Sequence, residues 1–434
     1  MIKVRTKNTW KIVSLALAMI MCLSMALPTF AAPPVNSSGD EDNPADAAVT
    51  KIFQMPEGTD TPDVEFIFEL EPIMVDDEDY DEDEENMPLV KDVKIELDED
   101  KVSTIDEVKK YVIESDKIFK DIDWPHAGVY TYEITEKNTY TIDDPKVEKF
   151  IFSQAKYELN VYVYNGKNGL YVAYVTAKII IEDESVEGDE NGKVDPTPEE
   201  NRTDGGLSEM VFTNTYAKTN GKPDITDPED PDDPDPEKPD PEVVWGNKVM
   251  TISKTVEGEL GNRNLDFIFN VTVDIPKVGI DADEQEYYAA YILEDDNGTK
   301  KTISGRLDFP VNPSEDREIL LKHNQLLVFT DMHVGASFVV TEDGTQNYTP
   351  SYILTLNGEQ GTKVTGPKNG ELSTLRKLIG EKLNLAAYTN TYDMVTPTGI
   401  SVDNLPYIAI LIAAAFALAG YITVKFRSKA KTNA

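Results

Sequence analysis

The sequence has 434 residues, which is too long for one ordinary small domain and suggests two or three. Its 80 acidic and 41 basic residues give a formal net charge of −39. An acidic excess of this size repels nucleic-acid phosphates and anionic lipids, which argues against a role in binding nucleic acid and suits an exposed, soluble surface.

The N-terminus has the layout of a secretory signal peptide. Several basic residues precede the apolar run 12–27, and a small-residue cleavage pattern follows it. We therefore predict a signal peptide over residues 1–31, with a mature chain that begins near Ala32. The only cysteine, Cys22, is removed with this peptide, which leaves the exported chain without a thiol or a disulfide.

Two segments, residues 45–218 and 246–393, have the pattern of half-buried β-strands. Every second residue is a large apolar one over 66–70 in the first segment and over 267–273 in the second. Many short strands with turn residues between them predict an all-β sandwich in each segment. One stretch, 371–383, differs because its leucine spacing predicts a helix.

Residues 219–245, between these segments, form an acidic, proline-rich linker. Alternation of proline with acid over 223–243 excludes a packed core, favours extended polyproline conformation and adds self-repulsion. We expect this spacer to keep the two domains apart, by up to roughly 75 Å at ~3.1 Å per residue. A second acidic run, 76–86, lacks the glycine of an EF-hand loop, so we predict a solvated loop and no metal site.

The C-terminus carries an apolar segment followed by basic residues. Residues 405–424 are uncharged and, at ~1.5 Å per residue, long enough to cover the ~30 Å hydrocarbon core of a membrane. The basic tail 425–431 holds that end in the cytoplasm, so the chain that precedes the segment lies outside the cell. We therefore predict a transmembrane helix over 405–424 and an exported chain at the cell surface.

The string VTPTG directly precedes this segment, and the order of motif, apolar helix and basic tail resembles the cell-wall sorting signal of Gram-positive surface proteins (395–431). The usual pentapeptide is LPxTG. Here Val395 and Thr396 replace Leu and Pro, and Pro397 stands one place late. The resemblance implies that a sortase cysteine attacks the carbonyl of Thr398, releases Gly399 and joins Thr398 to an amine of the cell envelope. The alternative is a plain single-pass membrane anchor.

Three short strings recur in the same order in the two β segments. The first segment opens with AVTKIFQMPEG, passes through GVYTYEITE and closes on FTNTY, and the second opens with TISKTVEG, passes through ASFVVTE and closes on YTNTY. Each segment thereby has a Lys in its first strand, a Glu in a middle strand and an Asn in its last strand. The residues are Lys51, Glu136 and Asn214 in the first segment, and Lys254, Glu342 and Asn390 in the second.

This repeated pattern resembles the isopeptide-bond domains of Gram-positive pilins and adhesins, particularly the two-domain streptococcal backbone pilin. The resemblance covers both segments and the C-terminal signal. It implies immunoglobulin-like sandwiches related to collagen-adhesin B-type domains. It also implies that the Lys and the Asn of each segment form a self-generated amide cross-link with the Glu as catalyst and without a cofactor.

The chemistry of amide exchange explains why these residue types are needed. A lysine amine attacks an amide carbon only when it is neutral, and burial disfavours the ammonium while raising the pKa of a carboxyl group. A protonated Glu can then polarise the Asn carbonyl and pass protons as ammonia leaves. The alternative is that Lys51 and Lys254 are ordinary lysines at strand edges.

The sequence favours a pilin-like structural or adhesive scaffold, anchored to the cell wall, over a secreted enzyme. Its three histidines form no HExxH motif, and it has no phosphate-binding glycine loop and no cysteine nucleophile in the mature chain. The expected partners are a sortase, an amine of the wall or of another pilin, the membrane before sorting, and a host or matrix ligand that the sequence does not identify. The alternative is a sortase-polymerised pilus shaft subunit. Lys193 or Lys368 would then supply the amine, because Leu207 stands where the similar pilin has a lysine.

Overall fold

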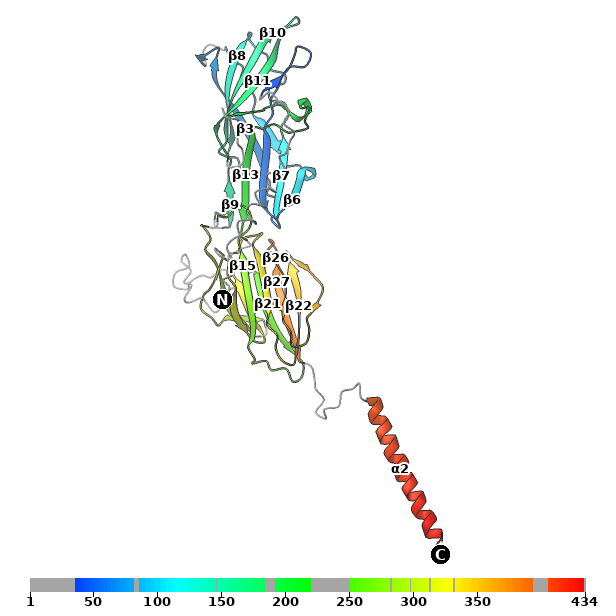
Figure 1. Ribbon diagram of the computed structural model, residues 1–434. Helices are drawn as coiled ribbons and strands as arrows, with labels where there is room; N and C mark the ends of the chain where they lie inside the picture. Colours follow the sequence, from blue (N-terminus) through cyan, green and yellow to red (C-terminus); the bar gives the residue numbers. More distant parts are fainter. Residues whose placement is uncertain are drawn as a thin grey trace, which may run out of the picture.

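The structure is a computed structural model that describes residues 36–81, 86–145, 147–183, 192–219, 250–281, 283–296, 298–311, 314–330, 332–392 and 405–432. The chain folds into β-strands that form two units with separate hydrophobic cores (Figure 1). We call them the N-terminal unit (residues 37–218) and the C-terminal unit (residues 250–392). The predicted all-β class is confirmed, whereas the predicted signal peptide (1–31) and sorting motif (395–399) lie outside the described residues.

Two sheets enclose the core of the N-terminal unit. The larger sheet consists of β1 (Ser37–Ser38), β11 (Leu170–Ile181), β10 (Lys156–Asn165), β8 (Gly128–Lys137), β3 (Glu65–Val75) and β4 (Glu78–Asp79) in that order, with β12 (Lys193–Val194) beside β11 and β5 (Val93–Glu96) beside β3. The smaller sheet consists of β6 (Val102–Ile105), β7 (Val108–Glu114), β2 (Thr50–Pro56), β13 (Val211–Lys218) and β9 (Glu148–Ile151) in that order. The described connections also contain two short 3-10 helices, η1 (Glu99–Lys101) and η2 (Glu199–Asn201).

The C-terminal unit repeats this two-sheet arrangement. Its larger sheet consists of β17 (Thr299–Thr302), β16 (Tyr287–Asp296), β20 (Gln325–Phe329), β14 (Met250–Glu257), β27 (Asn384–Tyr392), β22 (Tyr348–Leu356) and β23 (Glu359–Gln360) in that order, with β18 (Leu307–Pro310) beside β16 and β24 (Val364–Thr365) beside β22. Its smaller sheet consists of β19 (Arg317–Leu321), β15 (Phe267–Asp274), β21 (Ser337–Glu342) and β25 (Leu372–Ser373) in that order, with β26 (Lys377–Leu378) beside β21.

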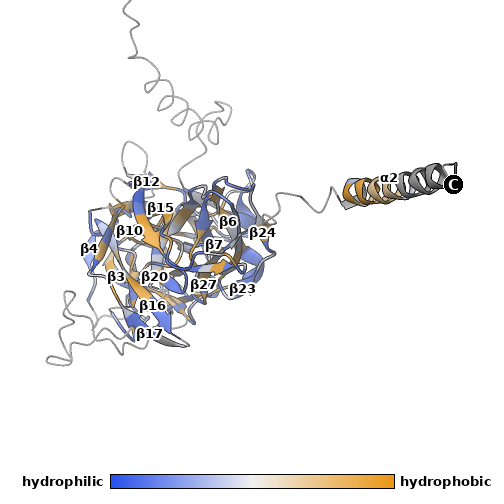
Figure 2. Ribbon diagram, turned by 90° about the horizontal axis from the view of Figure 1, so that it is seen from below, coloured by the Kyte–Doolittle hydropathy of each residue, from blue (hydrophilic) through white to orange (hydrophobic). Residues whose placement is uncertain are grey.

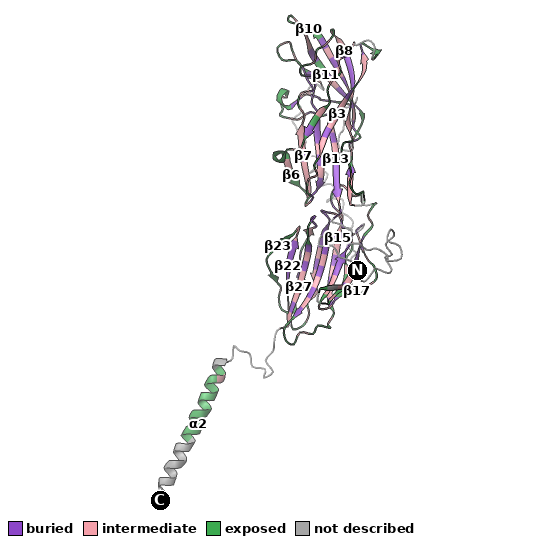
Figure 3. Ribbon diagram, turned by 180° about the vertical axis from the view of Figure 1, so that it is seen from behind, coloured by how far each residue is buried: buried purple, intermediate pink, exposed green. Residues whose placement is uncertain are grey.

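The predicted alternation of apolar residues explains how the sheets meet. Phe66 and Phe68 on β3 are buried, as are Phe267 and Phe269 on β15, because successive side chains of a strand point to opposite faces. Figure 2 shows hydrophobic residues along central strands such as β10, β16 and β20, and Figure 3 shows buried residues alternating with partly buried ones along the strands. One face of each sheet therefore supplies the core.

In each unit the first long strand pairs in parallel with the last strand. On β2 and β13 the register places Lys51 opposite Phe212, and on β14 and β27 it places Lys254 opposite Tyr388. The Asn of each repeated string lies two residues beyond that partner. Residues two apart on a strand share a face, so each Lys and its Asn project from the same side of the same sheet.

The helix predicted over residues 371–383 is wrong. This stretch forms β25 and β26, two short strands that both pair with β21. Thr374 donates its backbone N–H to the Val340 carbonyl and accepts the Val340 N–H on its hydroxyl. Leu375 has φ 55 and is 70% exposed, so it leaves the strand direction and the apolar spacing no longer marks a helix face. Pairing with a neighbouring strand overrides the local pattern.

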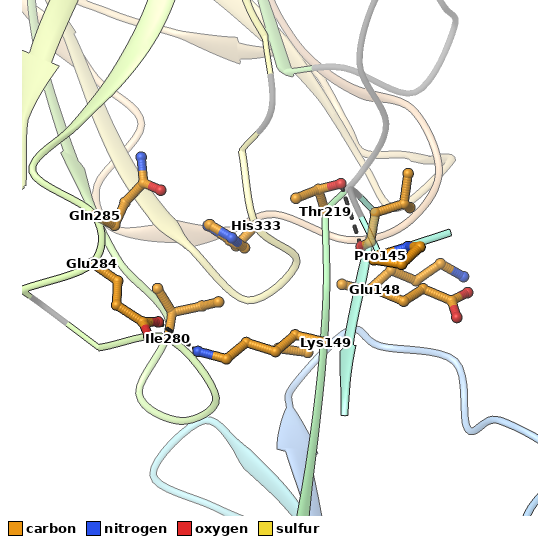
Figure 4. Close-up of a pocket in the computed structure, with 11 residues that line it drawn as sticks. Pro145, Glu148, Lys149, Thr219, Ile280, Glu284, Gln285 and His333 are labelled. Atoms are coloured by element: carbon orange, nitrogen blue, oxygen red, sulfur yellow. Dashed lines mark hydrogen bonds and ion pairs between the residues drawn. The ribbon is translucent and has the colours of Figure 1, made fainter. Parts of the chain in front are cut away.

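The two units are in contact, so the expectation that the linker holds them apart is wrong. Val334 donates its N–H to the Lys218 carbonyl at 2.8 Å, and the Lys218 ammonium lies 3.0 Å from Glu381 Oε2. A pocket of about 180 Å³ lies between the units, and Figure 4 shows Lys149 reaching Glu284 beside it, at 2.5 Å. Linker residues 220–249 lie outside the described residues. Direct contacts between the units therefore set their spacing.

The C-terminal helix α2 (Leu405–Thr432) covers the predicted membrane segment. Its described side chains, from Tyr407 to Tyr421, are mostly exposed (Figure 3). Among the helices of the described residues, none is both long enough and apolar enough to cross a membrane. The predicted transmembrane helix over 405–424 is therefore not confirmed.

Candidate functional site

The structure brings together the three residues predicted in the N-terminal unit. Lys51 Nζ lies 2.5 Å from Glu136 Oε2, and their side chains are 1% and 2% exposed. The Asn214 side-chain amide is also buried and donates from Nδ2 to Glu136 Oε1 at 2.5 Å. One carboxyl group thus contacts both the lysine amine and the asparagine amide, with one oxygen for each.

The two sheets position these side chains. Lys51 and Asn214 belong to the neighbouring parallel strands β2 and β13 of the smaller sheet. Glu136 belongs to β8 of the larger sheet, where it stands opposite Phe68 of β3. The carboxyl group therefore reaches the Lys and the Asn across the core, between the two sheets.

The C-terminal unit has the same arrangement. Lys254 Nζ lies 2.5 Å from Glu342 Oε1, and both side chains are 0% exposed. Lys254 and Asn390 belong to the neighbouring parallel strands β14 and β27, and Glu342 stands opposite Phe269 in the facing sheet. Asn390 is 1% exposed and lies close enough to Glu342 to lower the pKa of its carboxyl group.

Burial dominates the electrostatics of both sites. It lowers the pKa of Lys51 and of Lys254 to about 8, although the neighbouring carboxylate opposes the shift in each case. It raises the pKa of Glu136 and of Glu342, against the opposing effect of the lysine. Burial thus favours the neutral amine and the protonated carboxyl, since both charged forms lose their hydration.

Aromatic rings complete the apolar surroundings of each amine. Lys51 Nζ lies 4.5 Å from the centre of the Phe66 ring, and Lys254 Nζ lies 3.9 Å from the centre of the Phe267 ring. Both rings come from the strand that pairs with the Glu strand, and each lies two residues before the Phe that stands opposite the Glu. They cover the site on the side of the facing sheet and keep water from the amine.

The two sites differ in the partner of the asparagine carbonyl oxygen. In the N-terminal unit, Asn214 Oδ1 accepts the backbone N–H of Ser153 at 2.6 Å. In the C-terminal unit, Asn390 Oδ1 and Glu342 Oε2 are buried, and no described residue gives either atom a hydrogen bond of standard geometry. If Glu342 Oε2 carries a proton, it becomes a hydrogen-bond donor, which is what the unpaired Asn390 Oδ1 lacks.

Sequence reasoning missed Ser153 and Asp183, which lie beside the first site. Asp183 Oδ2 accepts the Ser153 hydroxyl at 2.6 Å and the Thr213 N–H at 2.8 Å. Neither residue belongs to a string that recurs in the second segment, so the repeat that revealed the other six residues gave no signal for these two.

Two further predicted features, the sorting motif and the acidic run, lie wholly or partly outside the described residues. The sorting motif residues Val395 to Gly399 lie outside the described residues. The acidic run 76–86 forms a turn and the short strand β4, and its residues 82–85 are likewise not described. No group of three or more His, Cys, Asp or Glu side chains in the described part of the chain could hold a metal ion.

Comparison with known proteins shows that the chain is pilin-like. Residues 47–217 match the family model described as a Spy0128-like isopeptide containing domain, which covers less than half of the chain. Residues 248–374 match a family described only as a domain of unknown function (DUF7601).

Individual relatives include pilins of Streptococcus pyogenes. A curated protein of Streptococcus pyogenes serotype M1 named "Pilin" is 27% identical over 172 residues, which cover 38% of this chain and 45% of the pilin. The chain thus matches less than half of that relative's length. The solved structure of the major pilin from Streptococcus pyogenes is 18% identical, with a TM-score of 0.30, and the match covers 80% of this chain and 98% of that one. A pilus-presented adhesin is 15% identical with a TM-score of 0.23, over 55% of this chain and 36% of the adhesin.

Proposed function

We propose that this chain is a pilin-like scaffold of the cell surface whose two units are each closed by a Lys–Asn isopeptide bond. One observation carries the proposal. In both units, a buried Lys and a buried Asn on neighbouring parallel strands lie beside one buried carboxyl group from the facing sheet. An ordinary strand-edge lysine has no reason to be buried, paired and placed in this way twice.

The reaction in the N-terminal unit follows from the contacts. Neutral Lys51 attacks the Asn214 side-chain carbon, so that the Nζ–Cγ bond forms and the Cγ–Nδ2 bond breaks. Glu136 takes a proton from Nζ through Oε2 and returns a proton to Nδ2 through Oε1, because these oxygens already contact the two nitrogens. The products are a secondary amide and one ammonia, and the carboxyl group is regenerated.

The C-terminal unit supports the same exchange between Lys254 and Asn390, with Glu342 as the proton carrier. Each reaction occurs once within its own chain, so the protein is a substrate of its own chemistry and not an enzyme acting on others. No cofactor takes part in either step, since both the nucleophile and the leaving group are side chains of the protein.

The bonds suit a scaffold that carries load. Each bond ties the first long strand to the last strand, so tension applied at the ends of a unit passes through the cross-link and not through the sheet hydrogen bonds. We assign both units to the immunoglobulin-like sandwiches of the collagen-adhesin B type, with domain limits of 45–218 and 246–393. The two-sheet architecture of each unit supports this assignment.

Export and anchoring complete the proposal. The signal peptide over 1–31 directs secretion, and the apolar segment 405–424 with its basic tail holds the chain in the membrane until a sortase cleaves between Thr398 and Gly399. Thr398 is then joined to an amine of the cell wall. The order of these segments in the sequence supports this part of the proposal.

Intact-mass spectrometry tests the cross-links. The mature chain should be lighter than its sequence mass by two ammonias, and peptide mapping should find Lys51 joined to Asn214 and Lys254 joined to Asn390. Asn214→Ala and Asn390→Ala should each abolish one loss, because each removes one acyl group. A wild-type chain at its full sequence mass contradicts the proposed function.

A second candidate is a pilus shaft subunit polymerised by sortase. The curated relative named "Pilin" favours it, and Lys193 and Lys368 are both exposed lysines that could supply the acceptor amine. An immunoblot of cell-wall extracts separates the candidates, since a high-mass ladder indicates a polymer and a single band indicates an anchored monomer. Loss of the ladder in Lys193→Ala or in Lys368→Ala would identify the amine.

A further inference from the structure

We propose that the backbone N–H of Ser153 is a catalytic oxyanion donor for the cross-link of the N-terminal unit, and that Asp183 is the residue that positions it. This inference rests on the proposed function, because it concerns the bond between Lys51 and Asn214. It adds a group that no repeated string contains and that the second unit does not share.

The contact between Ser153 and Asn214 carries the inference. The Ser153 N–H donates to Asn214 Oδ1 at 2.6 Å, and both residues are buried. A backbone N–H can only donate, so the atom that faces it is the carbonyl oxygen, and Nδ2 must then face Glu136. The contact therefore fixes which way the amide points.

Negative charge develops on this same oxygen during the reaction. When Lys51 Nζ bonds to the Asn214 carbon, the carbonyl electron pair moves onto Oδ1. When the electrons return, the bond to Nδ2 breaks and ammonia leaves. A fixed N–H aimed at an oxygen that gains charge stabilises the transition state, and it does so most strongly in a buried site.

Glu136 is not placed to donate a hydrogen bond to Asn214 Oδ1 as well. Its two oxygens already contact Lys51 Nζ and Asn214 Nδ2, which are the atoms that lose and gain a proton. The geometry thus divides the work, with proton transfer assigned to Glu136 and stabilisation of the oxyanion assigned to Ser153.

Asp183 holds the donor in place. It follows β11, and it accepts the Ser153 hydroxyl at 2.6 Å, the Gln154 N–H at 2.9 Å and the Thr213 N–H at 2.8 Å. Thr213 directly precedes Asn214 on β13. Asp183 therefore ties the segment that carries the donor to the strand that carries the acceptor, through hydrogen bonds strengthened by its charge.

The charge of Asp183 does not by itself make Lys51 and Glu136 more reactive. It raises the pKa of Lys51, which disfavours the neutral amine, and it raises the pKa of Glu136, which favours the protonated acid. These two effects act in opposite directions on the reactive pair. The hydrogen bonds from Asp183 to the Ser153 segment have no such opposing effect, because they only hold the N–H in place.

The C-terminal unit provides an internal control. Asn390 Oδ1 lacks a hydrogen-bond partner of standard geometry among the described residues, and so does Glu342 Oε2. That site has no counterpart of the Ser153 contact, so a proton on the Glu342 carboxyl must take over its role. Changes at Ser153 or Asp183 should slow the first cross-link and leave the second unaffected.

The test follows the loss of each ammonia in the full mature chain by mass spectrometry and peptide mapping at fixed times after synthesis. Ser153→Pro removes the N–H and should slow the Lys51–Asn214 bond by about 100-fold or more, the usual effect of losing one oxyanion donor. The Lys254–Asn390 bond should form at the wild-type rate. Ser153→Ala keeps the N–H and should form both bonds nearly as fast as the wild type.

Asp183 variants separate positioning from simple destabilisation. Asp183→Ala should slow the first bond, and Asp183→Asn, which keeps one acceptor oxygen, should restore part of the rate. The pH at which the rate is highest should fall in both variants, because loss of the Asp183 charge lowers the pKa of Lys51 and of Glu136 together, whereas the loss of rate should be larger in Asp183→Ala. Thermal unfolding in an Asn214→Ala background, where no bond forms, measures any loss of fold stability independently of the rate.

The outcomes are distinguishable. A Ser153→Pro chain that folds and forms both bonds at the wild-type rate overturns the inference and leaves the proposed function standing. If Ser153→Pro does not fold, Asp183→Ala decides, and an unchanged rate in that variant overturns the inference too. A wild-type chain that loses no ammonia refutes the proposed function itself, whatever the variants do.

Discussion

Lys254 Nζ lies 2.5 Å from Glu342 Oε1 in the core of the C-terminal unit, and both side chains are fully buried. A buried ion pair loses the hydration of both charges, which its mutual attraction repays only with excellent geometry. Transfer of one proton from the amine to the carboxyl removes both charges without changing the total number of protons. The apolar core thus shifts the equilibrium toward the neutral pair, which is the form that can attack Asn390.

Glu342→Ala should leave Lys254 and Asn390 unjoined, because neither residue can carry the protons that the exchange requires. The expected mass is lighter than the sequence mass by one ammonia, which comes from the N-terminal unit. The unlinked unit should still fold, since its strands bury the same apolar faces. It should unfold at lower temperature, because the bond closes residues 254 to 390 and a loop of that size contributes about 4–5 kcal/mol in the chain-entropy model.

The matched control is Glu359→Ala, which removes an exposed carboxylate of the same unit from β23. It should leave both cross-links and the unfolding temperature unchanged. Glu381 is unsuitable as a control, because it accepts the Asp60 N–H and contacts Lys218 at the junction between the units. Normal formation of the second bond in Glu342→Ala would refute the role of Glu342 even if Lys254 and Asn390 were joined.

The repeated strings made the two triads predictable from sequence. Lys51, Glu136 and Asn214 lie far apart in the chain, and only the recurrence of their order in a second segment indicated that they meet. Ser153 and Asp183 had no such recurrence, because their contribution depends on a backbone N–H and on the irregular segments that follow β9 and β11. Sequence patterns do not identify a backbone donor, since every residue except proline has one.

The two errors of sequence reasoning have a common physical cause. The apolar spacing over 371–383 is local information, and it lost to hydrogen bonding with β21. The composition of the linker indicates how stiff the linker is, but it does not indicate whether the two units contact each other. Contacts such as that of Lys218 with Glu381 arise between surfaces that are distant in sequence, so neither pattern could reveal them.

Glu381→Ala should loosen the junction without affecting either cross-link. The carboxylate accepts the Asp60 N–H at 2.9 Å and contacts Lys218 at 3.0 Å, so its loss leaves two partly buried donors without their acceptor. The cost is on the order of 1–3 kcal/mol. Small-angle scattering should show a wider range of distances between the units than in the wild type, while the mass stays lighter by two ammonias. Identical scattering curves would show that Glu381 does not stabilise the junction.

Thr398→Ala tests the sorting proposal in cells. A sortase that forms an acyl intermediate at Thr398 should no longer release the chain from its apolar segment, so the protein should shift from the wall fraction to the membrane fraction. Thr389→Ala, in the Thr-Asn-Thr string of β27 and outside the sorting motif, is the control and should remain in the wall. An unchanged fractionation of Thr398→Ala would contradict cleavage at this site.

The last prediction uses the pH dependence of stability to detect the bonds. In a chain with both Asn214→Ala and Asn390→Ala, Lys51 and Lys254 stay free amines whose pKa is about 8 in the folded state, against 10.5 for an unperturbed lysine. Between these values the unfolded chain binds more protons than the folded chain. The free energy of unfolding should therefore rise with pH from about 8 to about 10.5, by up to about 1.4 kcal/mol per pH unit for each lysine.

The cross-linked wild type should lack this rise, because an amide nitrogen does not titrate in this range. Urea unfolding measured at a series of pH values for both chains gives the difference directly. Adding Lys254→Met to the double variant should remove the part of the rise that Lys254 contributes, since the replacement has no amine. A wild-type curve that shows the same rise as the double variant would mean that the lysines are equally free in both, and hence that the wild type contains no isopeptide bond.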